Sequence, residues 1–367
     1  MLIGIIASST KKNEKRYPLH YQHINELSEE ERSHLIFEEG YPHLSKVKNH
    51  ENLLTASRKE VFAKADLVII PKPTKNDFPY FKEKQIIWGW PHCVQGKNIT
   101  EEGIKKQLTY IAFENMYQWR NKEKGRHIFA RNNELAGYAS VIHAFSSLGL
   151  TAGIYGPAFK TAVIGYGSTG RGAISALRGL GANDITVFTR RSKFEITDAL
   201  PGVKFRRYRV DRNGKTIMDE KPASESLAEY DVIVNCILQN PLHPITFLKR
   251  DDALKMRHSL LIVDVSSDEK MGFDFAHPTG FDQPSFEIGK VTYFAVNHSP
   301  TYFYESASYE ISGALFPFLK HIINNGTYAG NITLERAIDI EEGKIINKSI
   351  IDYQHREKEY PYKVTIK

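Results

Sequence analysis

The sequence has little cysteine, no long apolar run and no strong excess of either charge. Its two cysteines, Cys93 and Cys236, are far apart and lack metal-ligand spacing, which argues against a disulfide framework and favours free thiols in a reducing compartment. No run reaches the roughly 18 apolar residues that a membrane span needs. The first apolar run has no basic region before it, so we interpret it as a strand and not as a signal peptide. We therefore expect a cytoplasmic protein with no membrane partner.

The charges argue against a second class of partner. Lys and Arg number 49 against 43 Asp and Glu, which gives a formal net charge of +6. The basic residues are scattered among acidic ones and form no tail, so we expect no nucleic-acid partner. The hydrophobic fraction of 41% is that of a globular protein, and 367 residues suggest two domains.

Strand-like and helix-like segments alternate along the chain, which predicts an α/β architecture. The apolar runs that we interpret as buried strands span residues 2–7, 66–70, 85–90, 108–113, 231–237, 260–265 and 291–296. A long helix is predicted over 133–148 as the connection between two domains. Asn132 or Asn133 can cap it, and Gly149 can end it. Another helix is predicted over 306–324, where Pro317 favours a kink or a break.

A glycine-rich turn carries the strongest functional signal. Residues 161–170 read TAVIGYGSTG, so a short strand runs into Gly165, Gly167 and Gly170, with Ser168 and Thr169 between the last two. A helix over 171–180 and a strand over 185–189 follow. Glycines at this spacing permit a tight turn, backbone approach to a pyrophosphate and close helix packing, and the helix N-terminus offers N–H groups to phosphates. The segment predicts a dinucleotide-binding βαβ unit.

The residues after the second strand of that unit indicate which dinucleotide binds. A carboxylate at this position would accept hydrogen bonds from the ribose hydroxyls of NAD. The chain instead has Arg190, Arg191 and Lys193, and arginine forks match phosphate oxygens. We interpret the cluster as a preference for NADP(H); a solvated basic turn is the alternative.

Three polar groups of residues follow predicted strands in the N-terminal half. They are EKRYPL at 14–19, with Arg16, PKP at 71–73, with Lys72, and GWPH at 89–92, with His92. Side chains at the carboxyl ends of parallel strands meet at one edge of the sheet, where α/β proteins bind ligands. The pattern predicts a site for a small molecule there.

These segments together resemble a known superfamily. The residues GWPHCVQGKNIT (89–100), FARNNELAGYASVIHAF (129–145), VIGYGSTGRGAI (163–174) and NHSPTYFYESASYEIS (297–312) are similar to those of the alanine dehydrogenase, transhydrogenase and saccharopine dehydrogenase superfamily. Within it they most resemble the N5-(carboxyethyl)ornithine synthases. The resemblance implies a two-domain subunit. A Rossmann-type NADP-binding domain spans 150–299, a linker helix 133–149, and a discontinuous α/β substrate domain of the alanine dehydrogenase type 1–132 and 300–367. We also expect a homo-oligomer.

The resemblance implies a reaction and its residues. A keto acid, pyruvate, condenses with the side-chain amino group of ornithine or lysine, and NADPH reduces the imine. Arg16 would pair with the keto-acid carboxylate, Lys72 would hold its oxygen or carboxylate, and His92 would be the general acid and base. Asp268 matches an acidic residue near nicotinamide and substrate; Asp264 is its structural competitor. Glu114 follows a strand and could meet a substrate amine.

The remaining expected residues concern the cofactor. Asn133 and Asn297 match cofactor-contacting positions of the superfamily. The floor of the nicotinamide pocket could be formed by Cys236, Ile237 and Leu238. The histidines lack metal-ligand spacing, so no metal is expected.

Two other functions stay open at this point. One is reductive amination or oxidative deamination of the alanine dehydrogenase type, against which the basic turn at 190–193 argues. The other is a non-catalytic NADP-binding sensor, which would not need Arg16, Lys72 and His92. The sequence names neither the keto acid nor the amine donor, and a related diamino acid or a dehydroamino acid remains open beside ornithine and lysine.

Overall fold

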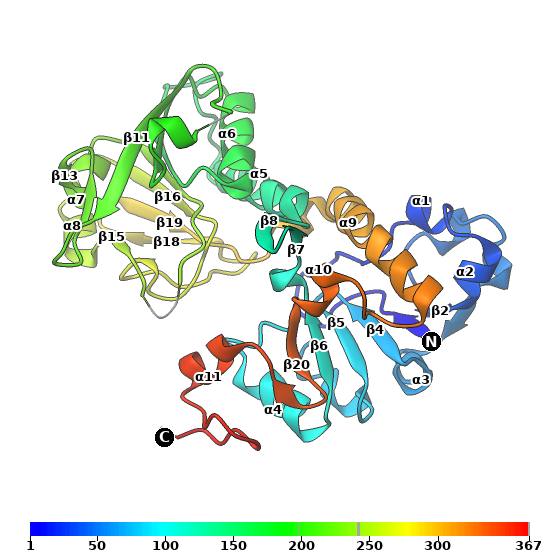
Figure 1. The fold of residues 1–367 in the computed structure, drawn as a ribbon. Helices are drawn as coiled ribbons and strands as arrows, with labels where there is room; N and C mark the ends of the chain where they lie inside the picture. The colour runs from blue at the N-terminus through cyan, green and yellow to red at the C-terminus, as the bar shows by residue number, and fades with distance from the viewer. Residues whose placement is uncertain (197, 241–242, 366–367) are drawn as a thin grey trace. The chain divides into compact units, whose positions relative to one another are not determined.

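The computed structural model describes residues 1–196, 198–240 and 243–365, apart from the side chain of Lys193. The chain divides into two compact units (Figure 1). The first unit comprises Met1–Ala130 and Tyr304–Lys367, and the second comprises Arg131–Phe303. The predicted connecting helix lies almost wholly in the second unit. Both units are α/β, as the alternation of apolar runs predicts.

The first unit is built on an eight-stranded sheet. Its strands lie in the order β21 (Lys344–Ile345), β20 (Ile338–Glu341), β6 (Thr109–Ala112), β5 (Ile86–Gly89), β4 (Leu67–Ile70), β1 (Ile3–Ile5), β2 (Leu35–Glu38) and β3 (Leu54–Ala56). The six strands from β6 to β3 are parallel, and β20 and β21 are antiparallel. A hairpin of β7 (Tyr117–Arg120) and β8 (Glu123–His127) stands apart from the sheet.

Helices cover both faces of this sheet. They are α1 (Tyr21–Ile24), α2 (Glu29–Ser33), α3 (Arg58–Lys64), α4 (Lys97–Lys105), α9 (Tyr304–Asn325), α10 (Ile332–Glu335) and α11 (Lys348–Gln354), with 3-10 turns η1 (Leu44–Lys46), η2 (His50–Asn52), η3 (Phe78–Tyr80) and η4 (Phe113–Asn115). Along β4, Leu67 and Ile69 pack in the core that α9 closes, whereas Val68 and Ile70 pack with α3 and α4. Burial on both faces explains why the parallel strands are apolar throughout.

The second unit has a nine-stranded sheet. Its order is β13 (Lys221–Pro222), β12 (Thr216–Met218), β11 (Val203–Val210), β10 (Asp184–Thr189), β9 (Lys160–Ile164), β14 (Val232–Asn235), β16 (Leu260–Asp264), β19 (Val291–Phe294) and β18 (Ser285–Ile288). The strands from β11 to β19 are parallel. The other elements are α5 (Ala130–Ser147), α6 (Ser168–Gly179), α7 (Ala223–Leu227), α8 (Arg250–Leu254), the pair β15 (Thr246–Leu248) and β17 (Gly272–Phe273), η5 (Lys193–Glu195) and η6 (Ser299–Phe303).

The predicted strands are all present, one to three residues shorter than their apolar runs. The cap assigned to Asn132 or Asn133 is wrong. The helix α5 begins earlier, at Ala130, so both asparagines lie in its first turn. Gly149 follows its end with φ of 66°, and Leu150 N–H donates to the carbonyl of Phe145 (2.8 Å), as expected of a glycine that ends a helix.

Of the kink or break predicted at Pro317, the break is wrong. The helix α9 runs without interruption from Tyr304 to Asn325. Ile311 and Leu315 before the proline and Leu319 and Ile322 after it are all fully buried in the same core. Packing on both sides of the proline holds the helix together where local propensity would end it. No helix within residues 1–196, 198–240 and 243–365 is long and apolar enough to cross a membrane.

The helices α5 and α6 pack so closely that only glycine fits at the contact. A Cβ on Gly137 of α5 would lie 1.9 Å from the carbonyl oxygen of Thr169, and one on Gly172 of α6 would lie 1.7 Å from that of Glu134. Both distances are far inside van der Waals contact, and both partners are backbone atoms that cannot rotate away. The two glycines therefore set the position of α6, whose first turn follows the glycine-rich loop.

We predict that Gly172→Ala destabilises the second unit by roughly 1–3 kcal/mol or more, because the added methyl must push two helices apart. Gly179→Ala is the matched control, because it changes the same helix at a position where a Cβ meets no atom within 4 Å. That control should leave stability unchanged or raise it, since alanine favours helix over glycine. Denaturant unfolding followed by circular dichroism measures both. Equal stabilities of the two variants would show that the contact is not restrictive.

Candidate functional site

The site residues expected in the first unit all follow carboxyl ends of adjacent parallel strands. Arg16 is in the loop after β1, Lys72 follows β4 and His92 follows β5. Glu114 lies in η4, directly after β6. The strand β1 lies between β4 and β2, so connections leave it in opposite directions, and such a switch point opens a crevice at the edge of a sheet.

Arg16 is held by a neighbour that the sequence did not single out. Its Nε donates to Glu14 Oε1 (2.7 Å) and its Nη2 to Glu14 Oε2 (2.6 Å), and both residues are buried. The guanidinium also lies 5.3 Å from the ring centroid of Trp90. Burial opposes ionisation of Glu14, but the Arg16 charge outweighs it and lowers the pKa of this carboxyl to about 2. Glu14 is therefore a fixed anion that orients Arg16.

Lys72 is placed among cations. Its carbonyl accepts a hydrogen bond from Ser9 Oγ (2.6 Å), and the prolines on either side restrict its backbone. Burial, followed by the charges of Arg16 and Lys11, lowers the pKa of the Lys72 ammonium to about 7. Near neutral pH this amine exists in both protonation states, as a group that exchanges protons with a substrate must.

His92 takes a left-handed backbone conformation, with φ of 50°, in the loop that follows β5. Its N–H donates to Glu114 Oε1 (2.8 Å), and its ring Nδ1 is 3.7 Å from the same oxygen. Burial, followed by the charges of Lys72 and Lys11, lowers the pKa of His92 well below its ordinary value. About half of the side-chain surface stays exposed, so the neutral imidazole can meet a ligand.

Two acidic side chains, the partly buried Glu114 and the buried Asp339, lie next to His92. Burial and the nearby Asp339 raise the pKa of Glu114, and burial raises that of Asp339. Asp339 accepts from Asn115 Nδ2 and Asn347 Nδ2 (2.8 Å each). Glu114 Oε2 and Asp339 Oδ2 have no hydrogen-bond partner among the residues that the structure describes. The pair can hold a proton within reach of the His92 backbone and ring.

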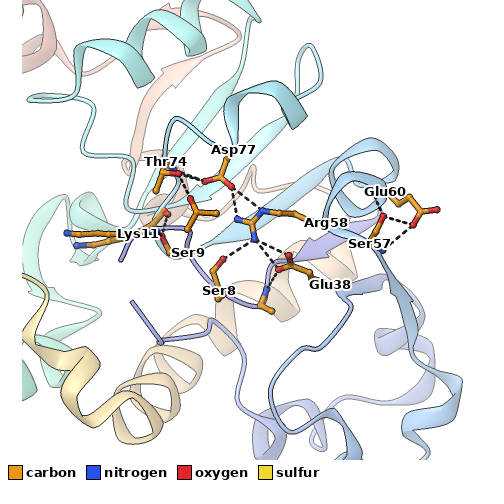
Figure 2. A network of polar contacts seen from close by, with 12 residues as sticks. Ser8, Ser9, Lys11, Glu38, Ser57, Arg58, Glu60, Thr74 and Asp77 are labelled. Atoms are coloured by element: carbon orange, nitrogen blue, oxygen red, sulfur yellow. Dashed lines mark hydrogen bonds and ion pairs between the residues drawn. The ribbon is translucent and has the colours of Figure 1, made fainter. Parts of the chain in front are cut away.

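Arg58, the first residue of α3, joins two loops and the end of β2 at the same edge of the sheet (Figure 2). Its Nη2 donates to Asp77 Oδ1 (2.6 Å), and its Nη1 donates to Glu38 Oε1 and to the carbonyl of Ser8 (3.0 Å each). Asp77 Oδ2 in turn accepts from Thr74 N–H (2.7 Å). One guanidinium thus connects the loops after β1 and β4, which carry Arg16 and Lys72, to the end of β2.

The glycine-rich turn of the second unit lies at its own switch point, because β9 is flanked by β10 and β14. Gly165 has φ of 101°, and a Cβ on Gly170 would lie 2.2 Å from the Gly165 carbonyl oxygen. A Cβ on Gly167 would meet nothing within 4 Å. This opening lies at the N-cap of α6, ahead of Ser168 and Thr169, so backbone N–H groups and the helix dipole face a space that a pyrophosphate would fill.

A pocket of about 640 Å³ adjoins this turn. Five of the residues predicted to contact the cofactor line it together with the first two glycines: Arg190, Arg191, Cys236, Ile237 and Leu238. The ring of Tyr208, on β11, also lines it and lies 5.7 Å from the Arg190 guanidinium. The Arg191 guanidinium lies 5.8 Å from the ring of Tyr166, the residue between those glycines. The side chain of Lys193 lies outside the described residues.

The other residues expected near the cofactor do not line this pocket: Ser168, Thr169, Gly170, Asp268, Asn133 and Asn297. Asp268 is half-buried, and burial raises its pKa. Asn133 is in the first turn of α5, and Asn297 follows β19 beside His298.

Asp264 accepts hydrogen bonds from Tyr293 Oη (2.6 Å) and Asn235 Nδ2 (3.0 Å), which accords with a structural role. Within the described residues, no group of three or more His, Cys, Asp and Glu side chains could hold a metal ion.

The second unit is a Rossmann-type dinucleotide-binding fold, and the first is an α/β unit with a cation-rich cluster at its sheet edge. Residues 137–348, more than half of the chain, match the model of the family "Alanine dehydrogenase/PNT, C-terminal domain". The chain belongs to this family, and the protein is accordingly an oxidoreductase that depends on a nicotinamide dinucleotide.

Similar proteins span nearly the same length. The N(5)-(carboxyethyl)ornithine synthase of Clostridium botulinum is 28% identical over 84% of this chain and 90% of its own. The alanine dehydrogenase of Methanococcus maripaludis is 23% identical over 81% of this chain and 80% of its own. A solved structure of L-alanine dehydrogenase shares the fold with a TM-score of 0.78 and 18% identity, covering 96% of this chain and 99% of that one.

We predict that the Lys72 amine titrates near pH 7 and that Lys11→Met moves the midpoint upward. Removing the Lys11 charge makes protonated Lys72 less unfavourable, so its pKa must rise. The measurement is the rate of Lys72 acylation by an amine-directed reagent as a function of pH, with peptide mass spectrometry. Lys12→Met is the control, because Lys12 is not among the charges that act on Lys72. A midpoint close to 10, as in free lysine, would contradict the arrangement.

Proposed function

We propose that the protein uses NADPH to reduce the imine formed between a keto acid and the side-chain amino group of an amino acid, giving an N-(carboxyethyl) amino acid when the keto acid is pyruvate. The observation that carries this proposal is the cation-rich cluster at the sheet edge of the first unit, in a chain whose second unit has a glycine-rich turn after β9 and two arginines after β10. The first unit would bind the substrates and the second the cofactor. The names of the ornithine synthase relatives support the same reaction.

The cluster suits an anionic substrate. Arg16, Lys72 and Lys11 present positive charge, and Glu14 balances only part of it. A keto-acid carboxylate would bind Arg16, with Lys72 at the carbonyl oxygen. Holding the keto acid in one orientation turns its encounter with the amine into a positioned reaction.

Condensation also needs proton transfer, because the amine must lose a proton and the carbinolamine must lose water. His92 is neutral and half-exposed, so it can take the proton from the amine and return it to the leaving hydroxyl. Lys72, with its pKa near 7, can act at the same oxygen. The nicotinamide cofactor, when bound, supplies the hydride that reduces the imine carbon. Asp268 would lie near the nicotinamide and the substrate.

The second unit would hold NADP(H). The backbone from Gly165 to Gly170, with Ser168 and Thr169, would bind the pyrophosphate, and Cys236, Ile237 and Leu238 would lie beneath the nicotinamide. Asn133 and Asn297 would add polar contacts. No carboxylate follows β10; the chain there has Arg190 and Arg191, with Lys193 beyond them. A 2′-phosphate would meet these cations, whereas NAD would find no partner for its ribose hydroxyls.

We predict that the protein prefers NADPH and that Arg190→Ala with Arg191→Ala weakens NADPH binding by roughly 10- to 100-fold while NADH binding changes little. Hydrogen bonds to a charged group contribute about 1.5–3 kcal/mol, and only NADPH has the phosphate. Fluorescence titration with both cofactors measures this. Arg178→Ala, at the far end of α6, is the matched arginine control. Equal losses for both cofactors, or a native preference for NADH, would contradict the assignment.

We predict that His92→Ala lowers turnover by roughly 10²–10⁴-fold, the usual contribution of general acid–base catalysis, with NADPH affinity unchanged. Arg16→Ala should chiefly raise the KM for the keto acid. The assay follows NADPH oxidation with pyruvate plus ornithine or lysine, against pyruvate plus ammonia. His50→Ala, which changes a histidine of the 3-10 turn η2, serves as the control.

Two outcomes would move the assignment. Turnover with ammonia as the amine donor would make the protein an alanine dehydrogenase. Tight NADPH binding without turnover on any amine would favour a sensor.

A further inference from the structure

A second polar cluster lies in the first unit beside Arg16. It centres on Glu305, in the first turn of α9, a helix that packs against α1 and α2 (Figure 1). Tyr17 Oη donates to Glu305 Oε2 (2.8 Å), and His43 Nε2 lies 2.6 Å from Oε1. His20 Nε2 is 3.9 Å from Oε2. The side chain of Glu305 is 44% exposed, so it faces solvent as well as these partners.

The loop that carries Arg16 is tied to α9. Tyr17 N–H donates to Ser308 Oγ (3.0 Å), and His20 N–H donates to Ser312 Oγ (2.8 Å). The Lys15 ammonium lies 5.7 Å from the ring centroid of Tyr304, the residue before Glu305. Lys15, Arg16 and Tyr17 are consecutive, so the keto-acid cluster and the Glu305 cluster lie on successive residues of one loop.

Glu305 is an anion whose neighbours leave it free to accept more. Partial burial opposes ionisation, but hydrogen bonds from His43 and Tyr17 lower the pKa of Glu305. Burial raises the pKa of Tyr17 far above its ordinary value and lowers that of His20, so both are neutral near pH 7. A carboxylate offers about four acceptor sites, and the two close donors occupy two of them.

The two clusters have opposite preferences for charge. Lys11, Arg16 and Lys72 repel an ammonium group, Glu14 is already paired with Arg16, and the raised pKa of Glu114 leaves that carboxyl mostly protonated near neutral pH. A diamino acid bears a second amino group that does not react and is protonated near neutral pH. That ammonium requires an anion outside the cation-rich cluster but within the length of the amino acid's side chain.

We propose that Glu305 binds the α-ammonium group of the amine donor and that Lys15 meets its α-carboxylate, so that the donor is a diamino acid recognised as a zwitterion. This inference rests on the proposed function and adds to it the residues that would recognise the second substrate. The side-chain amine of the donor, held at its other end by Glu305, would then reach the keto acid at Arg16 and Lys72. Tyr17 is a positioning residue that acts through Glu305.

The test compares ornithine with 5-aminopentanoate, which keeps the reactive amine and the carboxylate but lacks the α-ammonium. Wild-type protein should have a KM for ornithine roughly 10- to 100-fold lower than for 5-aminopentanoate, the factor expected for one charge-assisted contact. Glu305→Gln should raise the KM for ornithine by that factor and remove the difference between the two amines. Lys15→Met should raise the KM for both, since both have the carboxylate.

Controls separate this role from a merely structural one. The KM values for pyruvate and NADPH and the melting temperature of Glu305→Gln should stay at wild-type values, and Glu310→Gln, five residues along the same helix, should change none of them. An unchanged ornithine KM in Glu305→Gln, or a parallel rise in the KM for pyruvate, would overturn the proposal.

If wild-type protein turns over no amine, the proposed reaction fails, and calorimetric titration of the NADPH-bound protein with ornithine and with lysine still decides about Glu305. Binding of either amino acid that Glu305→Gln abolishes would sustain the subsite. Equal binding by both proteins, or none by the wild type, would refute it.

Discussion

The buried ion pair of Glu14 and Arg16 is the constraint on which the first unit depends. Two charges removed from water must satisfy each other, because an unpaired buried charge costs several kcal/mol. Here the pair does so through two parallel hydrogen bonds, and it fixes the guanidinium beside Lys72 and Trp90. Burial is the main cause of the lowered pKa values of Lys72 and His92, and the Arg16 charge adds to it at both groups. The proton chemistry of the site thus depends on burial and on where one arginine is held.

Arg58 has the corresponding role for the backbone. Arg16 and Lys72 lie in two separate loops, so their relative positions depend on what connects those loops. The part-buried network of Arg58, Asp77 and Glu38 makes that connection with charged groups whose hydrogen bonds are stronger than neutral ones (Figure 2). The loops that carry Arg16 and Lys72 are therefore not independent of each other.

The sequence predicted what depends on local pattern. Apolar runs located the parallel strands, and the glycine spacing located the turn after β9, because both follow from geometry within a few residues. Asp339 could not be predicted, since it reaches Asn115 only through pairing of β20 with β6, across more than two hundred residues. The role of Glu14 was not predicted, although it precedes Arg16 by only two positions. The sequence does not show that the Glu14 carboxylate bonds to the Arg16 guanidinium, because that depends on the conformation of the loop. At Pro317 local propensity was overruled by packing of α9.

The two units differ in when their residues become available during synthesis, because β20 of the first unit comes from near the C-terminus. The second unit is one continuous segment, Arg131–Phe303, and all its strands are available once that segment has been synthesised. The first unit is made of two segments, and its elements α9, β20 and β21 come from the segment that is synthesised last. Domains generally fold as units during synthesis. The Rossmann-type second unit can thus fold on the ribosome while the sheet of the first unit still has the edge of β6 unpaired and part of its core uncovered.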